Sequence, residues 1–177
     1  LRCLEDVRDN TATPPFAESG RVTANSHACT LDVSNMFVEI PIEKGAEVCQ
    51  EAWRTLRENV HLDHAVGPHV VLEVILFILA NTWLTFGSDV YSVKGGTAMG
   101  QPHSVVLANI FKTSFFKAFS ASNRSWKCYI AFFKHFLDDV FMFWNGDWQL
   151  FQVFKNTLNE WSANNGWKIQ FTVGQFG

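Results

Sequence analysis

Two apolar runs flank the carboxylate pair Asp138-Asp139, and this pattern restricts the possible folds of the chain more than any other feature. Residues 129–137 and 140–144 are rich in aromatic side chains, which favour β-strands. The short link between them predicts an antiparallel hairpin. Aspartate is disfavoured in strands and costly to bury unpaired. The pair therefore either faces water at an ordinary turn or forms part of a cation site.

The rest of the chain mixes strand-like and helical segments. Residues 28–33 and 90–93 have the pattern of short strands, and residues 167–173 that of a final strand. An N-cap is expected at Gly146 or Asp147, and helical spacing covers residues 42–59, 67–86, 102–120 and 147–163. This order of elements predicts an α+β fold in which helices back a small antiparallel sheet.

The composition suits one domain with one substantial core. The 177 residues are 47% hydrophobic and include seventeen Phe and seven Trp, which argues against disorder. The most apolar stretch, residues 70–80, is interrupted by Glu73 and is too short to cross a bilayer, so we expect no membrane association. The chain begins with Leu1 and stops at Gly177 directly after a strand-like run, so we expect a fragment of a longer protein.

Cysteine spacing and net charge argue against some classes of function for this chain. No two cysteines form a C-x-x-C pair, which predicts free thiols in a reducing compartment for Cys3, Cys29, Cys49 and Cys128. The net charge of −3 provides no basic surface and counts against a stand-alone nucleic-acid-binding module. It counts less against a site built from acidic metal ligands.

A third aspartate, Asp32, ends the strand-like segment 28–33. Taken alone it fits a cap or turn position near Ser34. If this strand neighbours the hairpin in one sheet, Asp32 converges with Asp138 and Asp139. Mg²⁺ is typically held by one or two carboxylates and by substrate phosphates, so such a cluster would suit two-metal phosphoryl or nucleotidyl transfer.

A glycine-rich loop at residues 95–100 (Gly-Gly-Thr-Ala-Met-Gly) precedes the helix predicted at 102–120. Such a loop lets the backbone approach a ligand closely, and the start of a helix favours phosphate. The loop is not a P-loop, because no Gly-Lys-Ser/Thr follows it. Taken alone it is equally an ordinary flexible connection.

In their order along the chain, these three elements resemble motifs A, B and C of reverse transcriptases. Residues 32–37 resemble motif A, residues 96–109 resemble motif B, and residues 136–139 (Phe-Leu-Asp-Asp) resemble the aromatic-x-Asp-Asp signature of motif C. The details are most similar to Penelope-like elements, which are relatives of telomerase. They are Gly-Thr-Ala-Met-Gly at 96–100, Ala108-Asn109, Ile40-Pro41, Leu158-Asn159 and residues 169–172.

The resemblance covers about residues 28–173 and implies a polymerase palm with partial fingers. Residues 1–27 would be a fingers-side segment and residues 28–177 the palm-centred region, with the thumb and any nuclease domain absent. The implied activity is RNA-directed DNA polymerisation by a retroelement enzyme. Its implied partners are an RNA template, a DNA primer and dNTPs, and its implied location is intracellular and nuclear.

The resemblance also assigns site residues. Two Mg²⁺ ions, or Mn²⁺ in their place, would be held by Asp32, Asp138 and Asp139, with Asp139 in the lesser role. Phe37 would pack under the incoming sugar and exclude a 2′-hydroxyl, the group that separates RNA from DNA building blocks; as an isolated residue it is equally a core Phe. Contacts with the nascent base pair and template are implied for Met99 and Gly100.

Several positions depart from the family pattern. Val105 stands where a Pro is usual, Gln101 and His103 replace smaller or apolar residues, and Gln170 lies where Lys is frequent. No fingers residue that grips the triphosphate is matched by Arg2, Arg8 or Arg21. Two rival functions therefore stay open. The first is a decayed or domesticated palm that binds nucleic acid or a partner, and the second is a nucleotidyl cyclase or RNA polymerase on a related palm.

Overall fold

The computed structural model describes residues 22–60 and 66–177. Most of the segment predicted on the fingers side, with Cys3, Arg2, Arg8 and Arg21, lies outside the described residues. Within the described ranges, the helices and strands form a mixed α+β fold with a small antiparallel sheet, as predicted. No helix in these ranges is both long and apolar enough to cross a membrane.

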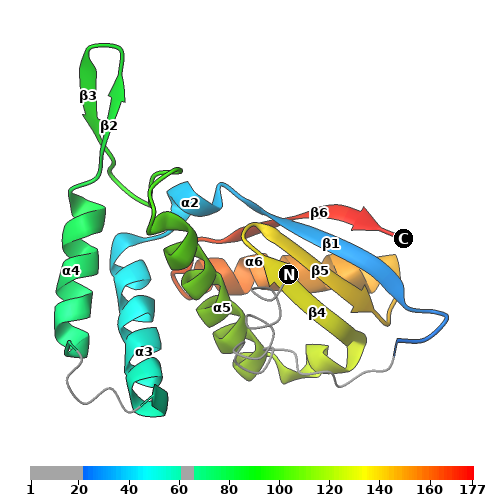
Figure 1. Cartoon of the computed structure of the whole chain (residues 1–177). Helices are drawn as coiled ribbons and strands as arrows, with labels where there is room; N and C mark the ends of the chain where they lie inside the picture. Colours follow the sequence, from blue (N-terminus) through cyan, green and yellow to red (C-terminus); the bar gives the residue numbers. More distant parts are fainter. Residues whose placement is uncertain (1–21, 61–65) are drawn as a thin grey trace, which may run out of the picture.

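The elements follow one another from a first strand to a last strand across a helical middle section (Figure 1). In chain order they are β1 (His27–Ser34), α2 (Met36–Glu39), α3 (Ile42–Val60), α4 (Pro68–Ala80), β2 (Trp83–Phe86), β3 (Asp89–Ser92), α5 (Ser104–Ser122), η1 (Arg124–Tyr129), β4 (Ile130–Phe136), β5 (Asp139–Trp144), α6 (Trp148–Asn164) and β6 (Gln170–Phe176). The short elements α2 and η1 were not expected from the sequence.

The main sheet has the strand order β4-β5-β1-β6, and every neighbouring pair is antiparallel. Strand β1 therefore lies between β5 and β6, although it comes first in the chain. This β-α-β-β-α-β order with a central first strand is the split βαβ arrangement. It brings the start of the chain's described region against a hairpin more than a hundred residues away.

Helices α5 and α6 cover one face of the sheet, and the core lies between these helices and the sheet. Alternate strand residues such as Leu31, Val140 and Phe133 point to this face and are buried. The ring of Phe116 on α5 lies 4.8 Å from that of Phe133, and the ring of Phe154 on α6 lies 5.2 Å from that of Trp144. Aromatic pairs at this spacing add to the stability that burial provides.

The N-cap of α6 confirms a prediction from the sequence. Asp147 Oδ1 accepts a hydrogen bond of 2.7 Å from the backbone N–H of Leu150, which satisfies one of the free donors of the first helical turn. The final strand begins at Gln170, three residues later than predicted, because Lys168 adopts a left-handed conformation (φ 57°).

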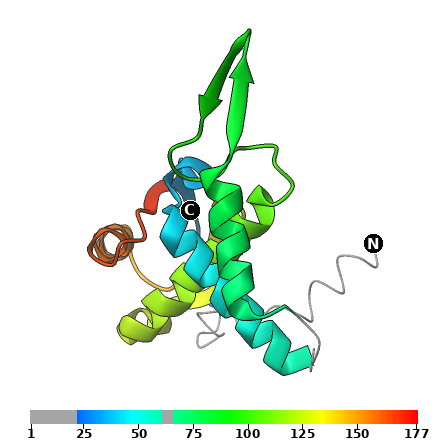
Figure 2. The ribbon, with the colours of Figure 1, turned by 90° about the vertical axis from the view of Figure 1, so that its left-hand side faces the viewer.

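The segment 83–86 was predicted to continue a helix, and this prediction is wrong. Helix α4 ends at Ala80, and Trp83–Phe86 pairs instead with Asp89–Ser92 as the β2–β3 hairpin. Gly87, with φ 62°, supplies the left-handed turn residue that the hairpin needs. The hairpin stands clear of α3 and α4 in both views (Figures 1 and 2).

Candidate carboxylate site

Asp32 and Asp139 are direct partners across the β1–β5 pair. Residues that face each other across an antiparallel pair project from the same side of the sheet. On β4, Phe136 pairs with Asp139, and on β6, Thr172 pairs with Asp32. One row of the sheet therefore reads Phe136, Asp139, Asp32, Thr172, on the face that α5 and α6 leave open.

Asp138 lies in the tight turn before β5, as predicted. Asp139 was also predicted to lie in the turn, but it is the first residue of β5. Leu137 has a left-handed backbone (φ 45°), which closes the turn. The backbone N–H of Val33 donates a 2.9 Å hydrogen bond to the carbonyl oxygen of Asp138. This bond ties the turn to β1 beside Asp32, so the structure brings all three predicted aspartates to one end of the sheet.

The three aspartates are exposed and carry only oxygen donors, which suits Mg²⁺ or Mn²⁺. Within residues 22–60 and 66–177, no cluster of three or more His, Cys, Asp or Glu side chains is close enough to enclose a metal ion. Mg²⁺ does not require such a cage, because it usually binds through one or two carboxylates and takes its other ligands from water and phosphate. An open pair of carboxylates fits that mode.

Lys112 lies beneath this end of the sheet and was not singled out by the sequence analysis. It is 0% exposed on α5, and its Nζ donates a 3.1 Å hydrogen bond to the backbone carbonyl oxygen of Asp139. Burial lowers the pKa of Lys112 to about 8, and the charges of Asp138, Asp139 and Asp32 act in the opposite direction. In the sequence, the burial of Lys112 is indicated only by its place among apolar residues of the predicted helix.

His135 lies near Lys112 on the covered side of β4. Its Nε2 is 3.5 Å from Thr113 Oγ1, and its Nδ1 is buried without a hydrogen-bond partner in the described part of the chain. Burial, together with the nearby charges of Lys112 and Lys134, lowers the pKa of His135 to about 4. The ring therefore carries no charge at neutral pH.

Phe37 lies on the one-turn helix α2, directly after β1. Asn35 starts this turn in a left-handed conformation, with φ 51°. The Phe37 ring is half-buried and packs against the core, so part of its surface remains accessible. This position is compatible with both the sugar-contact prediction and a core role.

The glycine-rich loop is bonded to the segment that carries Phe37. The N–H of Thr97 donates to the carbonyl of Phe37 at 2.7 Å, and the N–H of Gly96 donates to that of Ile40 at 3.0 Å. A Cβ atom at Gly96 would overlap the carbonyl oxygens of Phe37 and Val38, and the residue has φ +68°. Only glycine meets both requirements without strain.

The other end of the loop is fixed to the start of α5 by hydroxyl groups. Ser104 Oγ lies 2.6 Å from Thr97 Oγ1 and donates to the carbonyl of Ala98 at 2.6 Å. His103 Nε2 lies 3.3 Å from Thr97 Oγ1, which gives this unusual histidine a local partner. Residues 97–104 are therefore held together by hydrogen bonds and do not form an unattached loop.

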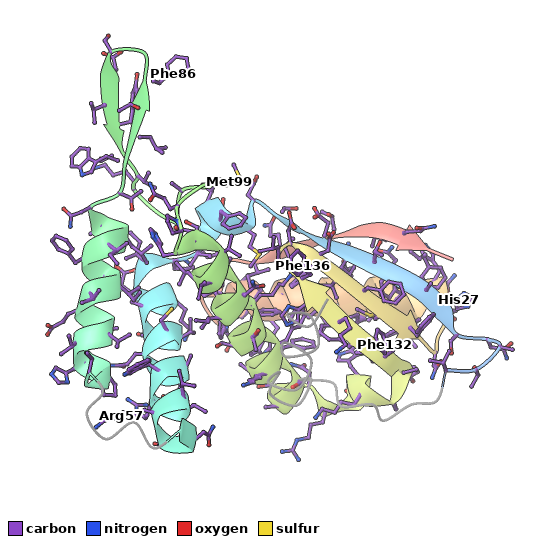
Figure 3. All side chains as sticks on the ribbon, viewed as in Figure 1. His27, Arg57, Phe86, Met99, Phe132 and Phe136 are labelled. Atoms are coloured by element: carbon purple, nitrogen blue, oxygen red, sulfur yellow. The ribbon has the colours of Figure 1, made fainter. Side chains whose placement is uncertain are left out.

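Met99 and Gly100, the remaining predicted contact residues, lie at the surface, and so does Phe136 of the motif C segment (Figure 3 labels Met99 and Phe136). Met99 is 77% exposed on the loop above α5, and Phe136 is 70% exposed at the hairpin end of β4. Gly100 has φ +90° and no neighbour within 4 Å of a Cβ position. The predicted contacts of Met99 and Gly100 with the nascent base pair and template remain predictions.

Comparison with models of protein families and with curated proteins finds no match to this chain.

Proposed function

We propose that this chain is the palm region of a reverse transcriptase of the Penelope-like kind, with partial fingers. The observation that carries the proposal is the direct cross-strand pairing of Asp32 with Asp139, one residue from Asp138, on the open face of a small antiparallel sheet. The order of the three motifs supports the same assignment.

Asp32 and Asp138 would hold two Mg²⁺ or Mn²⁺ ions, and Asp139 would support them. Bound ions would neutralise charge on phosphate oxygens and acidify the attacking hydroxyl. In the proposed reaction, the 3′-oxygen of a DNA primer loses its proton to water and bonds to the α-phosphorus of a dNTP, and the bond from that phosphorus to pyrophosphate breaks. The aspartates would contribute by holding both ions on one open surface, where substrate oxygens can reach them.

Phe37 would select dNTPs by packing under the sugar where a 2′-hydroxyl would otherwise lie. The hydrogen bond from Thr97 to its carbonyl supports this role, because it fixes the backbone of the proposed gate. Met99 and Gly100 would face the nascent base pair and an RNA template. The retroelement resemblance further suggests an intracellular, nuclear protein.

A decayed or domesticated palm that binds nucleic acid or a protein partner is the second candidate. The observation that favours it is exposed apolar surface on the β2–β3 hairpin, where Trp83, Phe86 and Tyr91 are all solvent-exposed. The departures at Val105 and Gln101 point the same way. This candidate predicts binding without nucleotide addition.

Divalent-ion binding tests the site directly. Mn²⁺ binding, followed by electron paramagnetic resonance, is expected to weaken about tenfold or more in D32N and D138N, because each loses a ligand charge. Asp89→Asn is the matched control, since Asp89 is also an exposed aspartate that begins the second strand of a hairpin. Equal weakening in D89N, or unchanged affinity in D138N, would contradict the metal site.

Primer extension by a form of the protein that includes the thumb separates the two candidates. On an RNA template with dNTPs, the wild type and D89N should extend a DNA primer and D138N should not. Phe37→Ala should reduce the preference for dNTPs over NTPs, and an unchanged preference would refute the sugar-gate role. Mn²⁺ binding without any extension by the wild type would favour the decayed palm.

A further inference from the structure

Lys112 is a charged residue in a position where charge is costly. It is 0% exposed on α5, next to Phe111, which is also completely buried. Lysine is almost never fully buried without a partner, because transfer of an ammonium group from water is strongly unfavourable. A long side chain usually extends its charged end to the solvent, and Lys112 does not. Its retention in the core therefore calls for compensating groups.

The compensating groups lie at the carboxylate site. The Lys112 ammonium donates a hydrogen bond to the carbonyl oxygen of Asp139 (3.1 Å), and the carboxylates that act on its charge are those of Asp138, Asp139 and Asp32. The ion pairs Lys44–Glu47 and Arg54–Glu51 both lie within α3 and involve no group of the carboxylate site. Lys112 therefore acts on the three aspartates together, from below the sheet, rather than pairing with one of them.

We propose that the Lys112 ammonium is a built-in counter-ion of the carboxylate site. It holds the Asp139 end of β5 in place, offsets the mutual repulsion of the three aspartates when no metal is bound, and lowers their affinity for divalent cations. The metal-binding part of this inference rests on the proposed function; the counter-ion part does not.

The consequence for metal binding follows from charge. A fixed positive charge under the sheet repels an incoming divalent ion while it attracts the carboxylates that would bind that ion. Because Lys112 is shielded from solvent, added salt screens this effect less than it screens surface charges. Removal of the charge should therefore tighten divalent-ion binding, whereas loss of a mere packing residue would weaken it or leave it unchanged.

The first test is Mn²⁺ binding to Lys112→Met, which keeps an unbranched apolar chain and removes the charge. Affinity should rise roughly three- to tenfold over the wild type at the same pH and ionic strength. Lys117→Met is the matched control, because Lys117 is an exposed lysine on the same helix and should leave affinity unchanged. Unchanged or weaker binding by folded K112M would overturn the proposal.

Instability of K112M is also decisive. If the variant folds only when Mn²⁺ is added, the metal is replacing the missing counter-ion, and the proposal is supported. If it fails to fold with Mn²⁺ present, the role of Lys112 is confined to packing, and the proposal is wrong.

A double-mutant cycle in EDTA tests the counter-ion without any metal. Asp138→Asn should be more favourable for thermal stability in the K112M background than in the wild type, by about 2–4 °C in Tm, because it then relieves uncompensated repulsion. Coupling in EDTA together with no Mn²⁺ binding by the wild type would refute the proposed function and keep the counter-ion. Mn²⁺ binding that requires Asp138, without coupling to Lys112, would do the reverse.

Discussion

His135 shows how a single buried residue links the fold to pH. Its ring lies 5.6 Å from that of Phe116 under the sheet, and burial lowers its pKa from 6.5 to about 4. Between these two values the unfolded chain binds a proton that the folded chain does not. The stabilising effect of the neutral ring is therefore complete above pH 6.5 and is lost as the pH falls toward 4.

We therefore predict that the free energy of unfolding falls by about 2 kcal/mol between pH 6.5 and pH 4 through His135 alone, a value reduced for partial solvation of the ring. Urea unfolding at several pH values measures this loss. His135→Leu should flatten the dependence, and His69→Leu, at an exposed position on α4, should not. An equal slope in H135L and the wild type would contradict the assignment.

The sequence indicates the titratable side chains at the surface of this protein better than those in its core. Asp138 and Asp139 were recognisable because a carboxylate pair interrupts two apolar runs. The burial of Lys112 and His135 was not predicted, because it depends on where α5 packs against the sheet. A local pattern carries no information on a contact of that kind until the packing is known.

The elements with a regular period were predicted nearly to their ends, while the one that depends on tertiary context was not. Helix α3 and strands β4 and β5 lie within about two residues of the prediction. Only Asn81 and Thr82 separate α4 from β2, with no Gly or Pro between them, so periodicity alone extended the helix. The strand pairing with Asp89–Ser92 overrides that tendency.

The bonded loop before α5 leads to an element-level prediction. Gly96→Ala should destabilise the protein by about 2–4 kcal/mol, because its Cβ would collide with two backbone carbonyls at a left-handed position. The adjacent Gly95 has open space around it, so Gly95→Ala is the matched control and should change stability little. Chemical denaturation of both variants measures the difference.

The same pair of variants tests whether the loop fixes Phe37. Displacement of the Phe37 carbonyl in G96A should reduce the preference for dNTPs over NTPs, as F37A does, while G95A keeps it. If G96A lost stability but kept the preference, the loop would support the fold without positioning the proposed gate.

Across the whole molecule, the site exists because the sheet is assembled from distant parts of the chain. Asp32 and Asp139 meet only when β1 inserts between β5 and β6, and no local pattern in the sequence indicates that insertion. The inserted strand β1 is held by backbone hydrogen bonds to β5 and β6, and its buried side chains pack in the same core as those of the hairpin. Site and core are therefore one cooperative unit.

Phe116 gives the sharpest test of that unity. Its fully buried ring lies 4.8 Å from Phe133 on the edge strand β4 and 5.6 Å from Phe171 on the opposite edge strand β6, so one side chain supports both edges. Phe116→Ala should cost about 3–5 kcal/mol in the free energy of unfolding, because it removes a large core side chain and leaves a cavity. Urea unfolding followed by tryptophan fluorescence should show one transition at lower denaturant with an unchanged slope.

Phe141→Ala is the matched control, since this phenylalanine is 37% exposed on the open face of β5, in the row next to Asp139. Its loss should cost only about 1 kcal/mol, because part of the ring is already in water. If F116A instead unfolded in two steps, or lost less stability than F141A, the two edges of the sheet would be independent. The carboxylate site would then owe its geometry to the strand pairing alone, and metal binding would outlast the loss of the core.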